Sequence, residues 1–300
     1  TKEQSPRRVV DLLGATIDLD AGRMRLSLRK RESYAIQARA TAAAASCTHD
    51  ELQSLLGKLN FAADFYPIGR QWLHAAWRAL RARFRTSPGT RILSKSARIG
   101  LKRWADELSK PGHEGVPLAP KAKFPAAGDA GSAVIYADAS RDSTDLCGYC
   151  AWTVKGDEFL FIEGRWSKAE RERLLICDLE LAASTFGLVT FAPLVGGEIV
   201  YSFTDNEVAK SAMRSQTPST LPMQTMTVAR TAWLFERGIA EKAERVTSKA
   251  NLWADLGSRS AMGELLRQAA RVGLRPRRLA TPPYWRALVA ETAASAREEA

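Results

Sequence analysis

The stretch Ala133-Val-Ile-Tyr-Ala-Asp-Ala-Ser140 decides the fold, because it joins an apolar, partly β-branched run to the acidic residue Asp138. A short apolar run bounded by polar residues is typical of a buried strand. Ile199-Val-Tyr-Ser-Phe-Thr-Asp205 has the same form further along the chain. Sheet proteins commonly place their functional groups where strands end. The two runs therefore predict two strands, each with a carboxylate at its end.

Further strands and helices surround these two runs. The sequence pattern predicts strands over 147–154, 158–165 and 243–246, and helices over 168–189, 207–213, 221–237 and from Asn251 onward. This order of elements predicts an α/β fold in which helices pack on the faces of a mixed five-stranded sheet.

Residues 111–131 separate this region from an upstream one, because their density of proline and glycine suits neither helix nor sheet. Upstream, the pattern predicts a β-hairpin over 9–28 and helices over 34–46, 69–84 and 94–108, with one more helix starting at a Thr48 to Glu51 capping box. We therefore expect four parts, which are residues 1–110, a linker over 111–131, the α/β region over 132–260 and a helical extension over 261–300.

Four acidic residues occupy special places on this scaffold, and they are Asp138, Glu180, Asp205 and Asp255. Glu180 lies within the expected helix 168–189, and Asp255 lies at the start of the helix after Asn251. Carboxylates that converge repel one another unless cations neutralise them. Oxygen ligands favour Mg²⁺ or Mn²⁺ over zinc, and paired ions on carboxylates suit in-line displacement at phosphorus.

Two of these acids, Asp205 and Asp255, also have a purely structural interpretation. Asp205 could simply end a strand, and Asp255 could stabilise a first helical turn through the helix dipole. Asp178 competes with Glu180, because it lies two residues earlier on the same helix and points about 200° away. Glu170, near the start of that helix, is expected to be a solvated first-turn acid.

Positive charge is concentrated in one segment. The chain has a net charge of +11, and residues 65–125 alone contain 13 basic and 3 acidic residues, whereas residues 126–260 contain 14 basic and 18 acidic residues. A basic segment next to an acidic α/β region indicates either a polyanion-binding arm or a solvated helix face.

Composition also indicates the cellular compartment in which the protein is expected. The longest apolar stretch, Leu181 to Val195, is interrupted by polar residues, so we expect no membrane-spanning helix. Four cysteines are too few for a disulfide scaffold, and Cys147 and Cys150 lie three apart on an expected strand, which favours core positions on opposite faces over a metal site. The chain opens Thr1-Lys2-Glu3 without an apolar leader, so we expect an intracellular protein that is a piece of a longer one.

The acidic pattern resembles the ribonuclease H domain of retroelement reverse transcriptases. The matching stretches are Asp138-Ala-Ser140, Glu180-Leu-Ala182, Thr204-Asp-Asn206 and Asn251-x-x-Ala-Asp255-x-x-Ser-Arg259. Upstream, Leu13-Gly-Ala-Thr-Ile-Asp18 and Leu55-Leu-Gly-Lys-Leu-Asn-Phe-Ala62 are similar to the palm-end hairpin and the thumb or connection of gypsy-like and DIRS-like elements. The resemblance covers residues 9–260.

This resemblance implies a ribonuclease H-like fold that cleaves the RNA strand of an RNA/DNA hybrid with two Mg²⁺ ions, for which Mn²⁺ can substitute. It implies that Asp138 bridges both ions, that Asp255 helps hold the ion that activates water, and that Glu180 with Asp205 holds the ion at the leaving oxygen. The basic helices would then grip the duplex through Arg70, Arg78, Arg81, Arg85, Lys102 and Arg103.

The sequence departs from the family at two points. It contains no Tyr-x-Asp-Asp, so the polymerase palm lies outside this chain and we expect no primer extension. Many members have a mobile histidine before the last aspartate, whereas Thr247-Ser-Lys-Ala250 has none and offers only Lys249 in its place. The alternative function is therefore a catalytically weak clamp with a ribonuclease H-like shape, which binds nucleic acid within a larger reverse transcriptase or ribonucleoprotein.

Overall fold

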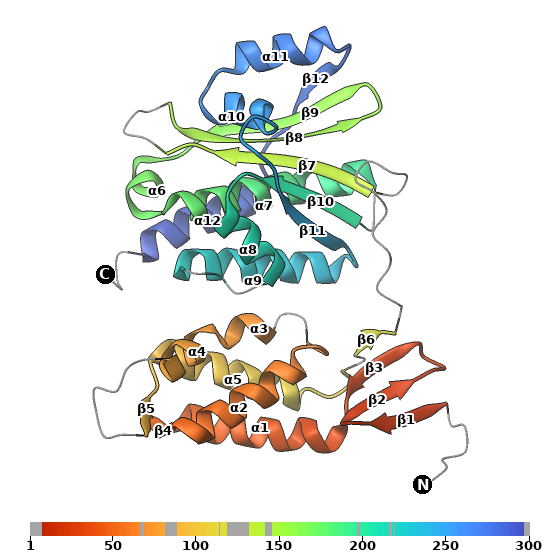
Figure 1. Cartoon of the computed structure of the whole chain (residues 1–300), viewed down its shortest axis with the longest axis vertical. Helices are drawn as coiled ribbons and strands as arrows, with labels where there is room; N and C mark the ends of the chain where they lie inside the picture. The colour runs from red at the N-terminus through yellow and green to blue at the C-terminus, as the bar shows by residue number, and fades with distance from the viewer. Residues whose placement is uncertain are drawn as a thin grey trace. The chain divides into compact units, whose positions relative to one another are not determined.

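A computed structural model describes residues 8–66, 69–81, 89–113, 115–118, 132–141, 146–196, 199–215, 218 and 220–296. The chain forms two compact units, Thr1–Lys123 and Phe124–Ala300, which are described separately below (Figure 1).

The first unit begins with a small antiparallel sheet. Its strands lie in the order β1 (Val9–Leu12), β2 (Ala15–Asp18), β3 (Arg23–Leu26) and β6 (Val116–Pro117). Leu13 and Gly14 form the first turn with positive φ angles of 53° and 91°, a region that glycine enters without steric cost. The hairpin expected over 9–28 therefore contains three strands instead of two, because the chain turns at Leu13 and Gly14 in addition to the turn after β2.

Helices form the rest of the first unit. They are α1 (Leu28–Ala43), α2 (His49–Ala62), α3 (Gly69–Trp72), α4 (His74–Arg81) and α5 (Lys95–Ser109), with a short β4 (Ser46–Thr48) and β5 (Thr90–Ile92) pair. The predicted capping box is confirmed, since Thr48 Oγ1 accepts from the Glu51 amide at 3.2 Å and the Glu51 carboxylate accepts from the Thr48 amide at 2.8 Å. The helix expected over 69–84 is interrupted at Leu73, and residues 82–84 lie outside the described part.

The second unit is built on a six-stranded sheet, in the order β11 (Ala240–Arg245), β10 (Ile199–Thr204), β7 (Ser132–Ala139), β8 (Gly148–Lys155), β9 (Glu158–Arg165) and β12 (Arg275–Arg278). β7, β8 and β9 are antiparallel neighbours, whereas β10 is parallel to both β7 and β11. The expectation of five strands is wrong by one, because β12 pairs parallel with β9. Residues 261–300 are therefore not purely helical.

Helices cover both faces of this sheet, as Figure 1 shows. α10 (Leu252–Ser258) and α11 (Met262–Arg271) pack on one face with Phe159 and Phe161. The opposite face packs mainly against α7 (Ile176–Val195), which with its neighbours encloses the larger core. The remaining helices are α6 (Lys168–Arg173), α8 (Glu207–Ser215), α9 (Leu221–Glu236) and α12 (Pro283–Ser295).

α7 is the most apolar helix of the described chain. It has 20 residues and a mean hydropathy of 1.3, so it is long and apolar enough to cross a membrane by length and composition alone. The apolar stretch is longer than the Leu181 to Val195 run considered in the sequence, because α7 starts at Ile176. However, 78% of the apolar window is buried inside the unit, as in the core helix of a folded domain.

The cysteines near β8 are confirmed as core residues. Cys147 belongs to the larger core, and Cys150 belongs to the smaller cluster on the opposite face of the sheet. Both cysteines are buried.

Candidate active site

Strand β7 presents Asp138 to the face of the sheet that α10 covers. Asp138 pairs in register with Cys150 of β8, while its neighbours Ala137 and Ala139 face the larger core on the other side. The alternation of side chains along a strand explains this division. The Asp138 side chain is therefore buried, with 4% of the residue exposed.

Glu180 and Asp205 approach Asp138 from α7 and from the end of β10. Glu180 is buried, and Thr204 Oγ1 lies 3.3 Å from its Oε2 atom. Asp205 directly follows β10 and is half-buried. Its Oδ2 atom accepts a hydrogen bond from Ser248 Oγ at 2.7 Å, and its backbone carbonyl accepts one from Arg245 Nε at 3.1 Å.

One carboxylate oxygen from each of Asp138, Glu180 and Asp205 lies within 4.8 Å of the others. Among the described residues this is the only group of three or more acidic, histidine or cysteine side chains placed to hold a metal ion. Its donors are all carboxylate oxygens, a set that fits Mg²⁺ or Mn²⁺ and does not suit zinc. The residues present therefore fit a divalent cation of this class.

Asp255 lies outside this group of three. Its Oδ1 atom accepts a hydrogen bond from Arg259 Nε at 2.6 Å, and its side chain is 32% exposed. It is nevertheless a neighbour of the site, because its negative charge raises the pKa of Asp138. The structure thus brings three of the four expected acids together and places the fourth beside them.

The electrostatics of the site favour a cation. Burial, and then the charges of Asp205 and Asp255, raise the pKa of Asp138 to about 7, although the Ser258 hydroxyl and Arg259 act in the opposite direction. Burial, and then Asp138 and Asp205, raise the pKa of Glu180 well above its ordinary value. A bound cation would stabilise both charged forms and reverse these shifts.

Asp178 has a different position and partners. Its Oδ2 atom accepts from the Leu175 amide at 2.7 Å, and its other oxygen accepts from the Thr220 hydroxyl. It therefore stabilises the first turn of α7 and is not a member of the carboxylate group.

Sequence reasoning assigned no role to three polar residues around Asp138. Ser258 Oγ lies 2.5 Å from Asp138 Oδ2, Ser140 Oγ donates to the Ser258 carbonyl at 2.7 Å, and Asn251 Nδ2 donates to the Ala137 carbonyl at 2.9 Å. All three lie in the sequence stretches that resemble the ribonuclease H family. Their hydrogen bonds, however, could not be deduced from the sequence alone.

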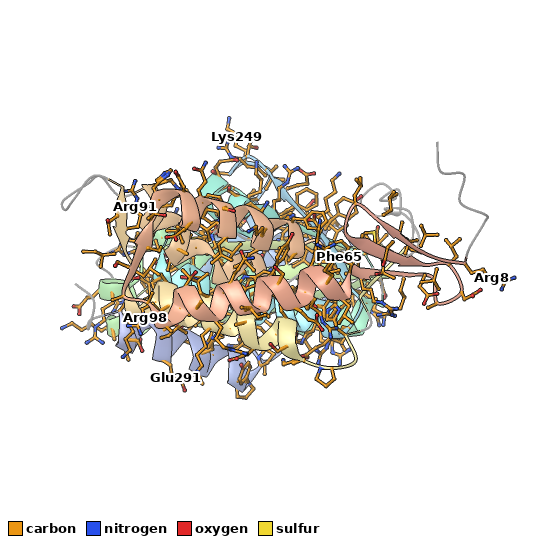
Figure 2. The ribbon with its side chains drawn as sticks, turned by 90° about the horizontal axis from the view of Figure 1, so that it is seen from below. Arg8, Phe65, Arg91, Arg98, Lys249 and Glu291 are labelled. Carbon is orange, nitrogen blue, oxygen red and sulfur yellow. The ribbon has the colours of Figure 1, made fainter. Side chains whose placement is uncertain are left out.

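The expected nucleic-acid contacts in the first unit are exposed. Arg70, which pairs with Asp64 at 2.5 Å, and Arg78, Arg81, Lys102 and Arg103 all reach the surface, while Arg85 lies outside the described residues. A groove of about 690 Å³ runs between α1 and α5, with Ala42, Ala43 and Ile99 among its lining and four basic residues around it, namely Arg39, Lys95, Arg98 and Lys102. Arg98 lies where α5 passes the C-terminal end of α1 (Figure 2).

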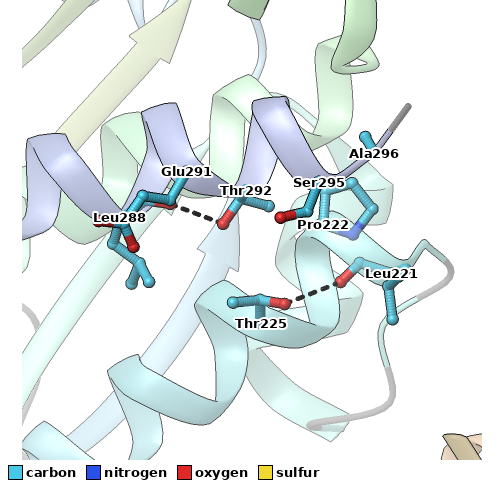
Figure 3. A pocket seen from close by; sticks show the side chains of 8 residues that line it. All are labelled: Leu221, Pro222, Thr225, Leu288, Glu291, Thr292, Ser295 and Ala296. Carbon is cyan, nitrogen blue, oxygen red and sulfur yellow. Dashed lines mark hydrogen bonds between the residues drawn. The ribbon is translucent and has the colours of Figure 1, made fainter. Parts of the chain in front are cut away.

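Another pocket, of about 320 Å³, lies between α9 and α12 and is mostly apolar (Figure 3). Its lining contains Glu291 but none of the acids of the carboxylate group.

Lys249, the residue expected to replace the mobile histidine, extends into solvent from the turn before α10 (Figure 2).

Several solved structures are similar to this chain. Ribonuclease H1 from Halobacterium salinarum has 16% identity and a TM-score of 0.34, over 45% of this chain and 99% of that chain. The N-terminal ribonuclease H domain of a Mycobacterium tuberculosis protein, fused to maltose-binding protein, has 18% identity and a TM-score of 0.34, over 46% and 98%. The foamy viral protease-reverse transcriptase in complex with double-stranded DNA has 16% identity and a TM-score of 0.31, over 79% and 45%. No protein-family model matches the sequence, and no curated protein matches it significantly.

The fold class is evident from the sheet itself. The order β11-β10-β7-β8-β9, antiparallel from β7 to β9 and parallel from β7 to β11, is the order of a ribonuclease H-like fold. β12 adds a sixth strand to its edge.

Proposed function

We propose that this protein is a ribonuclease H that hydrolyses the RNA strand of RNA/DNA hybrids endonucleolytically with divalent metal ions. The observation that carries the proposal is the convergence of Asp138, Glu180 and Asp205 at the ends of β7 and β10 and on α7. The hydroxyl partners of the three carboxylates, Ser258, Thr204 and Ser248, carry no charge that would offset the mutual repulsion, whereas a divalent cation would.

In this proposal Asp138, Glu180 and Asp205 hold two Mg²⁺ ions, with Asp255 as a further ligand. When bound, such ions stabilise the charge on the attacking and leaving oxygens of an in-line displacement. The protein supplies the fixed positions of these carboxylates. Ser248 donates to Asp205 and the Thr204 hydroxyl lies close to Glu180, which limits the orientations that these two carboxylates can take.

Recognition of the substrate would use the hybrid's shape. RNA differs from DNA by its 2′-hydroxyl groups, which line the wide minor groove of an A-form-like duplex. We propose that the end of β7 and the start of α7 contact these hydroxyls, since both segments flank the carboxylate group.

The first unit would hold the duplex. We propose that it corresponds to the palm end and the thumb or connection of a gypsy-like or DIRS-like retroelement reverse transcriptase whose polymerase palm lies outside this chain. The groove between α1 and α5 supports this role, because its basic side chains can contact phosphates while Ile99 and two alanines offer an apolar floor. Phosphate contacts of this kind would position the duplex without reading its sequence.

A clamp without catalytic activity is the second candidate. The sequence feature that favours it is the absence of a histidine in residues 247–250, where the family commonly has one. Such a clamp would bind a hybrid with the same basic surface and leave the RNA intact.

One experiment separates the two functions. The full chain is incubated with an RNA/DNA hybrid labelled on the RNA, and with double-stranded RNA, double-stranded DNA and single-stranded RNA of the same sequence, with Mg²⁺ or EDTA. A nuclease of the proposed type cuts only the hybrid, and only with Mg²⁺. Tight hybrid binding without any cutting would support the clamp.

A further inference from the structure

Ser258 makes the shortest contact to the carboxylate group from a residue that the proposed reaction does not use. Its Oγ atom lies 2.5 Å from Asp138 Oδ2, and it is completely buried. The same Oγ lies 3.0 Å from the Asp255 carbonyl, one turn earlier in α10. A hydroxyl has one proton, and the shorter, charge-assisted bond to the carboxylate takes it.

This contact depends on the close seating of α10 against the sheet. Gly257 makes the seating possible, because a Cβ atom there would lie 2.3 Å from the Cys150 sulfur. Two further hydrogen bonds fix the helix, one at each end. Asn251 bonds to the Ala137 carbonyl, and Ser140 bonds to the Ser258 carbonyl while accepting from the Gly148 amide at 3.0 Å.

We infer that Ser258 is a positioning residue that fixes the orientation of the Asp138 carboxylate toward Glu180 and Asp205. The terminal torsion of an aspartate side chain is broad, so an unpartnered carboxylate would sample many orientations. By occupying one oxygen, the Ser258 hydroxyl sets the direction of the other. It also ties Asp138 to α10, the helix that carries Asp255. This inference rests on the proposed function only in that Asp138, Glu180 and Asp205 are taken to bind metal ions.

Ser140 provides a matched control for this role. Both serines are buried and both make a hydrogen bond at the C-terminal end of α10, but of the two only Ser258 hydrogen-bonds to the Asp138 side chain. Loss of either hydroxyl should lower stability to a similar degree. Only loss of the Ser258 hydroxyl should change how the site binds metal.

The test measures Mn²⁺ binding to the full chain by isothermal titration, together with thermal unfolding and the kcat and KM for hybrid cleavage. The variants are Ser258→Ala, Ser258→Cys, Ser258→Thr and Ser140→Ala. Ser258→Cys preserves the shape of the side chain but is a weak donor, so it remains informative if Ser258→Ala folds poorly.

We expect Ser258→Ala and Ser258→Cys to weaken Mn²⁺ affinity roughly tenfold and to lower kcat by a similar factor with little change in KM, the usual cost of removing a partner of a metal ligand. Ser258→Thr keeps the hydroxyl and should restore most of the affinity, and Ser140→Ala should bind Mn²⁺ like the wild type. Equal Mn²⁺ affinity in Ser258→Ala and Ser140→Ala would overturn the inference. If the wild type binds Mn²⁺ in this pattern but cuts no hybrid, the proposed function fails and the role of Ser258 stands.

Discussion

Asp138 combines deep burial with three acidic neighbours, Glu180, Asp205 and Asp255, and this combination sets its chemistry. A carboxyl group in that position is costly to ionise, because water no longer solvates its charge. The Ser258 hydroxyl offsets part of that cost, and a divalent cation would offset much more. Without metal the site therefore raises the pKa of Asp138 to about 7, and a bound cation would favour the ionised form.

A pH dependence of stability follows from the raised pKa of Asp138. An acid whose pKa is about 7 in the folded state and near 3.8 in the unfolded state stabilises the fold fully below about pH 4, and this contribution is lost as the pH rises to 7. In EDTA, we expect the free energy of unfolding of the wild type to fall by a few kcal/mol over this range relative to Asp138→Asn. Mg²⁺ should restore the loss at pH 8.

Chemical denaturation at several pH values provides the measurement, with Asp138→Asn as the control for all other titrating groups. Parallel pH profiles for the wild type and the variant would contradict the raised pKa.

The sequence allowed the residues of the site to be predicted better than their partners. Asp138 and Asp205 were predicted from the ends of apolar, strand-like runs, whereas Glu180 was preferred over Asp178 only through the resemblance to the ribonuclease H family. The contact between Ser258 and Asp138 could not be predicted, because it depends on how closely α10 approaches β8, and that distance is set by Gly257 in three dimensions. Only the structure shows that Asp178 bonds to the first turn of α7 and leaves Glu180 to face the other acids.

At the scale of elements, the C-terminal segment is part of the second unit. Glu170 is fully buried, contrary to the expectation of a solvated acid, and its carboxylate accepts from both terminal nitrogens of Arg286 in α12. Burial raises the pKa of Glu170, but the bonds from Arg286 and Ser167 outweigh it, so the pKa is lowered overall. This ion pair fastens α12 to α6.

Removal of Arg286 should therefore destabilise the unit strongly. Arg286→Ala leaves a buried, uncompensated carboxylate, and we expect it to lower the free energy of unfolding by about 3 kcal/mol. Glu172→Gln, which removes an exposed pair with Lys168 on the same helix, should cost no more than about 0.5 kcal/mol. Urea denaturation measures both, and equal effects would show that the buried pair contributes no more than a surface pair.

The sixth strand illustrates why some elements could not be predicted. Arg275-Pro-Arg-Arg278 lacks apolar alternation, so no pattern indicated a strand. It pairs with β9 at the sheet edge, where proline is tolerated, and ion pairs join its arginines to Asp157, Glu158 and Glu163. The interruption between α6 and α7 was missed for the opposite reason, because Leu174 and Leu175 continue the apolar pattern.

For the whole molecule, charge is distributed unevenly between the two units, so we expect the first unit to bind the duplex and the second to cleave it. Residues 261–300 contain 7 basic and 4 acidic residues, which only nearly offsets the acidic excess of residues 126–260. The second unit thus has no net positive charge with which to hold a duplex, and in the proposed function its acids lie where the scissile phosphate would bind.

Separating the units should therefore weaken the binding of hybrid more than it slows the cleavage step. We expect residues 124–300 alone to fold, to bind hybrid weakly and to cut with a raised KM. The dependence of log K on log salt should flatten by roughly 0.9 for each phosphate that the basic side chains no longer neutralise. Lys95→Glu with Lys102→Glu in the full chain should have the same effect on a smaller scale.

Filter binding at several salt concentrations gives these slopes. If the isolated second unit matches the full chain in both affinity and slope, the basic surface of the first unit does not hold the duplex.

The most direct test of the proposed ribonuclease H activity is Mg²⁺-dependent cleavage of the labelled RNA strand by the wild type, Asp205→Asn and Asp178→Asn, measured alongside hybrid binding. We predict that Asp205→Asn reduces cleavage by roughly a hundredfold or more, since it removes a ligand of the ion that stabilises the transition state, and that it leaves binding nearly intact. Asp178→Asn should cut almost normally, because that residue only stabilises the start of α7. Cleavage by Asp205→Asn within about threefold of the wild type, less than about 1 kcal/mol in the barrier, would contradict the account.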